Sequence, residues 1–296
     1  MGDALLAPRS LGALTGEMAR LLTPAFGRDA EHEARELLAA LHDMPRHWPL
    51  LERGTAMSAD AWERALAAAA RRARGAPLQY AAGRAAFRHL TLDVDERVLI
   101  PRPETEQLVE IVLELTRDSA GGVAVDVGTG SGAIALALAS EGTFEQVIAT
   151  DVSLDALDVA RGNVRRCAAA LRAAVSLRHG SLLGPVAERG VRAVVSNPPY
   201  IAYDEAASLP AGVRNWEPAV ALYSGADGMA ATARLVREAA LTLATGGLLA
   251  VEVDARRAGT AAELVASAGA YADVRVLLDL TGRERFVVAR RREEQG

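Results

Sequence analysis

The segment VRVLLDLTGRERFVVA, residues 274–289, decides the fold. Its two apolar runs, 274–278 and 285–289, have the composition of β-strands. Only residues 279–284 separate them, whereas two parallel strands need a connection of roughly a dozen residues or more. We therefore expect these strands to form an antiparallel hairpin near the end of the chain.

Alternating strand and helix patterns precede this hairpin. The expected strands are 123–127, 146–150, 174–178, 191–196 and 248–253, and the expected helices include 133–140, 229–243 and 258–268. Such alternation predicts an α/β domain with a mainly parallel sheet. A nicotinamide-type doubly wound domain would keep parallel crossovers to its end. A hairpin added to a parallel sheet instead resembles the Rossmann-like, seven-stranded fold of S-adenosylmethionine-dependent methyltransferases.

The first of these strands runs directly into a glycine-rich turn, Gly128-Thr129-Gly130-Ser131-Gly132, which leads into a helix. Glycines let the backbone approach a ligand closely, and a helix amino terminus favours anionic or polar groups. The next strand ends in Asp151, where an acid reaches a ribose diol in an open α/β sheet. We expect an adenosine-bearing cofactor, although a dinucleotide fits the turn almost as well and Asp151 could instead cap a helix.

The strand 191–196 stops at Asn197-Pro198-Pro199-Tyr200. Two successive prolines cannot extend a sheet, and each holds the residue before it in extended geometry. The stiff loop presents the side-chain carbonyl of Asn197, the main-chain carbonyl of Pro198 and the ring of Tyr200. Two acceptors close together suit a planar NH₂ group, so we expect this loop to bind an amide or amino nitrogen. The alternative is an ordinary turn that ends a strand.

The amino-terminal part of the chain has a different pattern. Residues 1–78 carry apolar side chains at helical spacing and predict a small helical bundle for partner recognition, with helix starts at Ser10, Thr23-Pro24 and Ser58. Residues 79–103 predict a linking β-hairpin, and 104–296 the catalytic domain. Pro103 fits the first turn of a helix that we expect to lie over the cofactor pocket.

Composition excludes several classes of site. The single cysteine, Cys167, excludes an internal disulfide, and the five scattered histidines have no metal-ligand spacing, so we expect no metal. No apolar run reaches the roughly 18 residues of a membrane span, and the charged first 30 residues lack a signal-peptide core, so we expect a cytoplasmic protein. The net charge of −5 gives no overall attraction to nucleic-acid phosphates.

Four segments together resemble the protein-glutamine methyltransferases that modify peptide-chain release factors on the glutamine of a Gly-Gly-Gln motif. They are Leu99-Ile100-Pro101-Arg102-Pro103-Glu104-Thr105-Glu106, Asp126 to Gly132, Asn197-Pro198-Pro199-Tyr200-Ile201, and Trp216-Glu217-Pro218 with Ala221-Leu222 and Gly225-Ala226-Asp227-Gly228. The NPPY tetrad is shared with adenine and guanine amino-methylases, whereas the RPETE and EPxxAL segments are more selective. The resemblance implies S-adenosylmethionine as cofactor and a release factor as partner. We expect the protein to be a monomer.

The same resemblance assigns roles to residues. It implies that the glycine turn, Gly128 to Gly132, holds the methionine portion of the cofactor, that Asp151 holds the ribose, and that Asn197 to Tyr200 bind the substrate amide. Ser181 and Leu182 would lie at the adenine, where the family often has Gly-Asp-Leu-Phe and this chain has Gly180-Ser181-Leu182-Leu183. A second departure is Glu252-Val253-Asp254, where the family has Glu-x-Gly.

Three further residues admit two interpretations each. We expect Glu217 to fix a loop rather than form the pocket wall, and we expect Arg102 and Glu104 to shape the cofactor lid rather than pair with each other. Two alternative functions remain open at this point. A nucleic-acid amino-methyltransferase would hold a flipped base in the same loop, and a non-enzymatic scaffold would result if the altered adenine wall had abolished activity.

Overall fold

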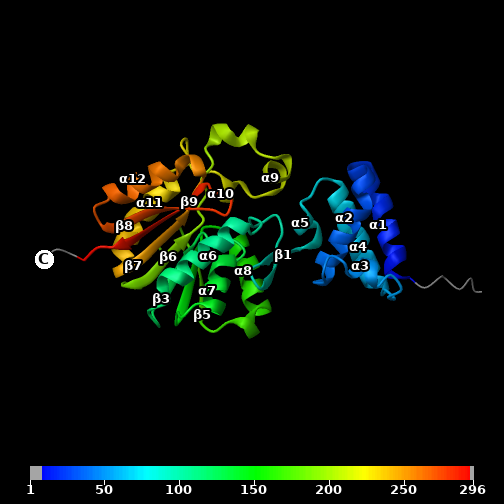
Figure 1. Ribbon diagram of the computed structural model, residues 1–296, viewed down its shortest axis with the longest axis horizontal. Coiled ribbons are helices and arrows are strands. Elements are labelled where there is room, and N and C mark those ends of the chain that lie inside the picture. The colour runs from blue at the N-terminus through cyan, green and yellow to red at the C-terminus, as the bar shows by residue number, and fades with distance from the viewer. Residues whose placement is uncertain (1–8, 294–296) are drawn as a thin grey trace, which may run out of the picture. The chain divides into compact units, whose positions relative to one another are not determined.

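The computed structural model describes residues 9–293, and the chain divides into two compact units, Met1–Ala85 and Ala86–Gly296 (Figure 1). The first unit is helical. Its elements are α1 (Leu11–Phe26), η1 (Gly27–Asp29), α2 (Ala30–His42), α3 (Trp48–Leu51), α4 (Ala59–Ala73) and α5 (Leu78–Ala82). Leucines on α1 and α2 pack against small alanines of α4, which lets the helices approach closely.

Two of the three expected helix starts in this unit are confirmed. The hydroxyl groups of Ser10 and Ser58 cap α1 and α4 by accepting from the backbone N–H three residues ahead. The expected start at Thr23-Pro24 is wrong, because both residues lie inside α1. Pro24 is tolerated there because the helix ends two residues later, at Phe26, and is followed by the cap Gly27 with its φ of 53°.

A short hairpin, β1 (Arg84–Phe87) and β2 (Leu90–Asp93), forms the separate two-stranded sheet. It is shorter than the expected stretch 79–103, because residues 79–82 belong to α5 and residues 94–100 form turns and loops. Helix α6 (Pro103–Thr116) then begins with Pro103 in its first turn, as predicted. No helix among residues 9–293 is long and apolar enough to cross a membrane.

A seven-stranded sheet forms the centre of the second unit, in the order β5-β4-β3-β6-β7-β9-β8. Its strands are β3 (Val123–Val127), β4 (Gln146–Asp151), β5 (Ala174–His179), β6 (Val191–Ser196), β7 (Leu243–Glu252), β8 (Tyr271–Leu278) and β9 (Glu284–Arg291). The pairs among β3 to β7 are parallel, and β9 pairs antiparallel with both β7 and β8. The predicted methyltransferase-type sheet with its terminal hairpin is confirmed.

Helices cover both faces of this sheet (Figure 1). Helices α6, α7 (Ala133–Glu141) and α8 (Leu154–Arg166) pack on one face, and α11 (Ala230–Thr242) and α12 (Ala258–Ser267) pack on the other. Alternate residues of a strand point to opposite faces, so Ala124 belongs to the first core and Val125 to the second. The remaining elements are η2 (Ala168–Ala170), η3 (Tyr203–Ser208), α9 (Ala211–Trp216), α10 (Ala219–Leu222) and η4 (Ala255–Arg257).

The strand order places a crevice beside β3. From β3 the chain proceeds outward to β4 and β5, then returns to the opposite side of β3 as β6. Ligands of open α/β sheets bind at such a reversal, outside the carboxyl ends of the strands. The glycine turn, Asp151 and Asn197 follow or end β3, β4 and β6, so all three lie at this edge.

Candidate active site

Three cavities in the second unit share Leu99 and Asn197 in their walls. The largest, which we call the cofactor cavity, has a volume of about 440 Å³. Seven of the residues that we predicted to bind cofactor or substrate line this cavity: Gly128, Gly130, Asp151, Ser181, Leu182, Asn197 and Pro199. Segments that are far apart in sequence therefore surround one cavity of ligand size.

The second cavity, which we call the amide cavity, has a volume of about 230 Å³. Asn197, Pro198 and Tyr200 line it, together with apolar residues of α9 and α10 and the charged residues Arg102, Glu205, Asp254 and Arg256. Burial, followed by the nearby charge of Glu252, raises the pKa of Tyr200 to about 12. The Tyr200 hydroxyl is therefore protonated and a hydrogen-bond donor at neutral pH.

The third cavity, of about 50 Å³, is lined by Thr129 and Ser131 of the glycine turn. Gly132 lines none of these three cavities. It caps α7 with a φ of 86°, and a Cβ atom there would lie 3.3 Å from Leu136 Cδ1 and 3.5 Å from Ala160 Cβ. Glycine at this position is explained by helix packing, and its contact with a cofactor stays a prediction.

Two acids, Asp151 in the wall of the cofactor cavity and the buried Asp126, hold the glycine turn in place. Asp151 accepts from the N–H of Gly130 and from the N–H of Ser153, both at 2.9 Å. The hydroxyl of Ser153, not Asp151, caps α8. Because each carboxylate oxygen has two lone pairs, Asp151 keeps acceptor capacity toward the cavity for a diol.

Asp126, at the end of β3, is fully buried. Its Oδ2 accepts from the Thr129 hydroxyl and the Ala135 N–H, while its Oδ1 has no partner among residues 9–293. Burial raises the pKa of Asp126 to about 7. An unpartnered carboxylate oxygen beside the turn suits a cationic amine, so the residues fit a ligand with an amine at one end and a ribose diol at the other.

The first departure from the family pattern has a structural counterpart. The hydroxyl of Ser181 accepts from Nη1 of Arg234 at 3.1 Å, and both residues line the cofactor cavity. Glu238 holds Arg234 by an ion pair at 2.6 Å and accepts from the backbone N–H of Leu183. An arginine therefore lies beside Ser181, at the position where the family often has a carboxylate.

A buried hydrogen-bonded chain runs from α6 to the end of β7 through the amide of Asn197. Nδ2 of Asn197 donates to the hydroxyl of Thr105 at 3.0 Å, and that hydroxyl donates to Oε2 of Glu252 at 2.7 Å. Thr105 and Glu252 are 5% and 1% exposed. The side-chain carbonyl of Asn197 is therefore left as the acceptor that this residue can offer to a ligand.

Arg102 pairs with Glu217 and not with Glu104. Nη2 of Arg102 donates to both carboxylate oxygens of Glu217 at 2.6 Å each. The Glu217 side chain is 1% exposed, which agrees with the expected loop-fixing role. This pair joins the segment before α6 to the loop between α9 and α10, beside the amide cavity.

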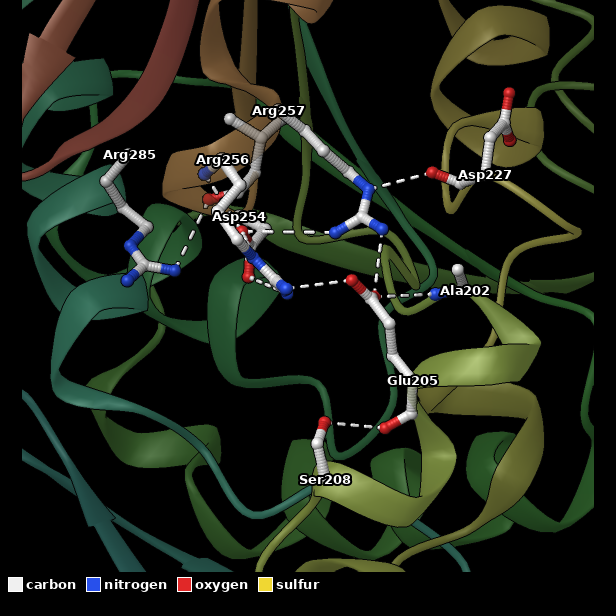
Figure 2. A network of polar contacts seen from close by, with 9 residues as sticks. Ala202, Glu205, Ser208, Asp227, Asp254, Arg256, Arg257 and Arg285 are labelled. Atoms are coloured by element: carbon white, nitrogen blue, oxygen red, sulfur yellow. Dashed lines mark hydrogen bonds and ion pairs between the residues drawn. The ribbon is translucent and has the colours of Figure 1, made fainter.

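A polar network holds the segment that follows Tyr200 (Figure 2). Glu205 accepts from the backbone N–H of Ala202 at 3.1 Å and pairs with both Arg256 and Arg257 at 2.8 Å. Arg257 also donates to the backbone carbonyl of Asp227. Asp254, at the family's glycine position, caps η4 and pairs with Arg256, so this second departure adds a carboxylate to the wall of the amide cavity.

Backbone contacts join the loop after β6 to the EPxxAL segment. The N–H of Ile201 donates to Leu222, and the N–H of Ser224 donates back to Ile201. Gly228 has a φ of 74°, and a Cβ atom there would overlap the carbonyl oxygen of Tyr200 and lie 2.8 Å from Nε of Arg257. The last glycine of the Gly-Ala-Asp-Gly segment therefore lets the two loops pack together.

Sequence reasoning did not assign a role at the site to Thr105, Glu252 or Asp126. All three lie in segments with a clear sequence pattern. At their positions, a polar residue is explained equally well by an ordinary helix start or strand end as by a role in the site. The available signal was the position of Glu252 at the end of an apolar strand, since polar residues at carboxyl ends of adjacent parallel strands come together.

Two family models match the chain, the PrmC N-terminal domain at residues 16–83 and the Methyltransferase small domain at residues 104–210. A methyltransferase of known crystal structure from Pyrococcus furiosus has the same fold, with a TM-score of 0.51, 19% identity and coverage of 70% of this chain and 92% of that one.

Curated relatives extend the match to nearly the whole chain. A release factor glutamine methyltransferase from Moorella thermoacetica is 44% identical over 76% of this chain and 78% of its own. The protein of that name from Deinococcus radiodurans is 42% identical over 94% of this chain and 97% of its own. By this identity over nearly its full length, the chain belongs to the family of release factor glutamine methyltransferases.

Proposed function

We propose that this enzyme transfers a methyl group from S-adenosylmethionine to the side-chain amide nitrogen of the glutamine in the Gly-Gly-Gln motif of a peptide-chain release factor. One observation carries the proposal: Asn197 lies in the wall of both the cofactor cavity and the amide cavity. An acceptor at that border can hold an amide nitrogen against a methyl donor. The charge-lined amide cavity suits a polar side chain.

Catalysis of this reaction depends on positioning. A carboxamide nitrogen is a poor nucleophile because its lone pair is delocalised into the carbonyl. When bound, S-adenosylmethionine supplies a methyl group that is already strongly electrophilic on its sulfonium. Oδ1 of Asn197 and the carbonyl of Pro198 would accept the two amide hydrogens, which increases electron density on nitrogen and directs its lone pair toward the cofactor cavity.

These acceptors bind more strongly as positive charge develops on the nitrogen. They therefore stabilise the transition state more than the ground state. No general base has to act before attack, because the acidified N–H can lose its proton afterwards. Alignment of the two reactants contributes on the order of 7–11 kcal/mol on the scale of intramolecular reactions.

The cofactor is proposed to bind between the glycine turn and the residues that follow β4 and β5. The buried Asp126 and the turn Gly128 to Gly132 would hold its methionine portion, and Asp151 its ribose. Ser181 and Leu182 would border its adenine. These roles use the free acceptor capacity at Asp126 and Asp151 described above.

The helical unit is proposed to recognise the release factor, and the enzyme is proposed to act as a monomer in the cytoplasm, where its substrate works. A methyltransferase of nucleic-acid amines could use the same acceptors. The sequence similarity over the RPETE and EPxxAL segments favours the release factor, because those segments are more selective for the family than the NPPY tetrad.

Mass spectrometry of a co-expressed release factor tests the substrate. We expect one added methyl group, located by fragmentation to the glutamine of the Gly-Gly-Gln peptide. A release factor in which that glutamine is replaced by asparagine is the control and should stay unmodified. Incorporation of label from S-adenosylmethionine into bulk nucleic acid, with none in the release factor, would contradict the proposal.

A further inference from the structure

The orientation of the Asn197 amide is set by residues that do not border the amide cavity. Thr105 is on the first turn of α6, and Glu252 is the last residue of β7, next to β6 in the sheet. The hydroxyl of Thr105 has one hydrogen, which it donates to Glu252. Because that hydrogen is committed, Thr105 can only accept from Asn197, and Asn197 must turn its NH₂ group toward Thr105.

We propose that Thr105 and Glu252 are positioning residues whose hydrogen-bond direction, set by ionised Glu252, makes Asn197 present its oxygen to the substrate amide. The inference rests on the proposed role of Asn197 as an acceptor. If its hydrogen were not committed to Glu252, the Thr105 hydroxyl could either accept from the NH₂ group of Asn197 or donate to its carbonyl oxygen. The Asn197 amide could then adopt either orientation. A flipped Asn197 would point its own NH₂ group at the NH₂ group of the substrate amide. Two donors cannot hydrogen-bond to each other, so the substrate nitrogen would not be bound.

The ionisation of Glu252 therefore controls the relay. If Glu252 is protonated, it can donate to Thr105, whose hydrogen can then be donated to the carbonyl oxygen of Asn197. The relay reverses, and Asn197 turns its NH₂ group toward the substrate. No bond to carbon changes in this step, and the one added proton comes from solvent and stays on Glu252.

The surroundings of Glu252 place this change near neutral pH. Burial raises the pKa of Glu252 to about 7, against the opposing effects of the Thr105 hydrogen bond and of Arg285 on β9. Glu104 on α6 raises the pKa further, and Arg102, just before α6, lowers it. Tyr200, after β6, also faces Glu252. Activity should then fall about tenfold per pH unit below the pKa of Glu252.

Kinetics of matched variants test the relay. Thr105→Val removes the hydroxyl, and we expect kcat to fall roughly 10- to 100-fold, since misplacement of a positioning group has effects of that size. Its pH dependence near neutrality should disappear, while affinity for S-adenosylmethionine stays within about twofold of the original value. Thr105→Ser should restore both kcat and the pH profile.

Thr116→Val is the control. Thr116 is on the same helix, is 4% exposed, and donates its hydroxyl only to the helix, to the carbonyl of Val112. The variant should keep the original kcat and pH profile. Glu252→Gln should lose the pH dependence. The double variant Thr105→Val/Glu252→Gln should be no slower than Thr105→Val, because Thr105 and Glu252 act through the same hydrogen-bonded chain and their effects should not add.

A second measurement does not depend on the substrate. The side-chain amide resonance of Asn197, assigned by its loss in Asn197→Ala, should titrate with a midpoint near the pKa of Glu252 in the unmodified enzyme and in Thr116→Val. It should not titrate in Thr105→Val. An Asn197 resonance that stays constant from about pH 5.5 to about pH 8.5, or a Thr105→Val variant with unchanged kcat and pH profile, would overturn the relay. Failure to methylate a release factor would instead count against the proposed function. The Asn197 amide resonance would still report on the relay in that case, because it is measured without substrate.

Discussion

Arg102 and Glu217 are 115 positions apart in the chain, yet Nη2 of the arginine donates to both carboxylate oxygens at 2.6 Å. The glutamate lies almost fully buried, whereas the arginine side chain is 32% exposed. The pair connects the segment before α6 with the loop that carries the EPxxAL motif. Two selective sequence motifs of the family therefore meet in one ion pair at the amide cavity.

Replacement of this arginine should destabilise the protein in a pH-dependent way. In Arg102→Met, Glu217 stays buried without its partner, and breaking such a pair should cost about 1–3 kcal/mol, less than for a fully buried pair because Arg102 is partly exposed. Burial already raises the pKa of Glu217, which Arg102 opposes. Without Arg102 the pKa of Glu217 rises further in the folded state but not in the unfolded state. The free energy of unfolding of the variant therefore falls as the pH rises through the folded-state pKa of Glu217.

Urea denaturation at about pH 5 and about pH 8 checks this prediction. The stability deficit of Arg102→Met should be larger at the higher pH. Glu217→Gln is the control, because the arginine that it leaves unpaired can reach solvent, and its deficit should be small and nearly independent of pH. An equal deficit of Arg102→Met at both pH values would show that the charge of Glu217 is not responsible.

Asn197→Ala should keep the fold and lose catalysis. Removal of one charge-stabilising acceptor costs roughly 3–4 kcal/mol in the transition state, so turnover should fall at least about a hundredfold. Affinity for S-adenosylmethionine, measured by calorimetry, should be largely retained because the glycine turn and Asp151 are unchanged. Methylation at close to the original rate would exclude Asn197 as the acceptor.

Gly228 and Gly246 form a matched pair for testing the contact between the two loops. Both have positive φ, 74° and 75°, but a Cβ atom at Gly246 meets nothing within 4 Å, whereas one at Gly228 overlaps the Tyr200 carbonyl. Gly246→Ala should cost about 1–2 kcal/mol from backbone strain alone. Gly228→Ala should cost more and should also lower kcat/KM at least tenfold, because Tyr200 lines the amide cavity.

Thermal unfolding and steady-state kinetics of the two glycine variants separate these effects. If both variants lose the same stability and keep the same kcat/KM, the close approach of Gly228 to Tyr200 has no role in the site.

Ser181→Asp should strengthen cofactor binding about fivefold, since a charged acceptor stabilises a hydrogen bond by roughly 1 kcal/mol more than a hydroxyl. Ser181 lines the cofactor cavity, and a carboxylate there would accept from the adenine amine at the position that we propose for it. Ser208→Asp, which adds the same charge at the amide cavity, is the control. Calorimetry that finds equal affinities in the two variants would mean that the added charge, and not its position, matters.

Local patterns predicted most of the fold. Strand β6 has the expected bounds, and the terminal hairpin followed from the short connection between its strands. Strand β7 is longer than expected because Leu243 pairs with Val191 before a bulge, a contact between strands that no local pattern contains. The misplaced helix start at Thr23 has a different cause, since a proline in the last turn of a helix has the same local sequence pattern as one in the first turn.

The sequence by itself determined the class of fold, the family, and the loop that ends β6, because strand periodicity, proline stiffness and glycine turns act within a few residues of the chain. Only the tertiary structure decided which partners hold that loop. Thr105, Glu252, Arg102 and Glu217 come together because α6 packs beside the carboxyl ends of β6 and β7. Hydrogen-bond direction and pKa depend on such neighbours and on burial, which arise only when distant segments pack together.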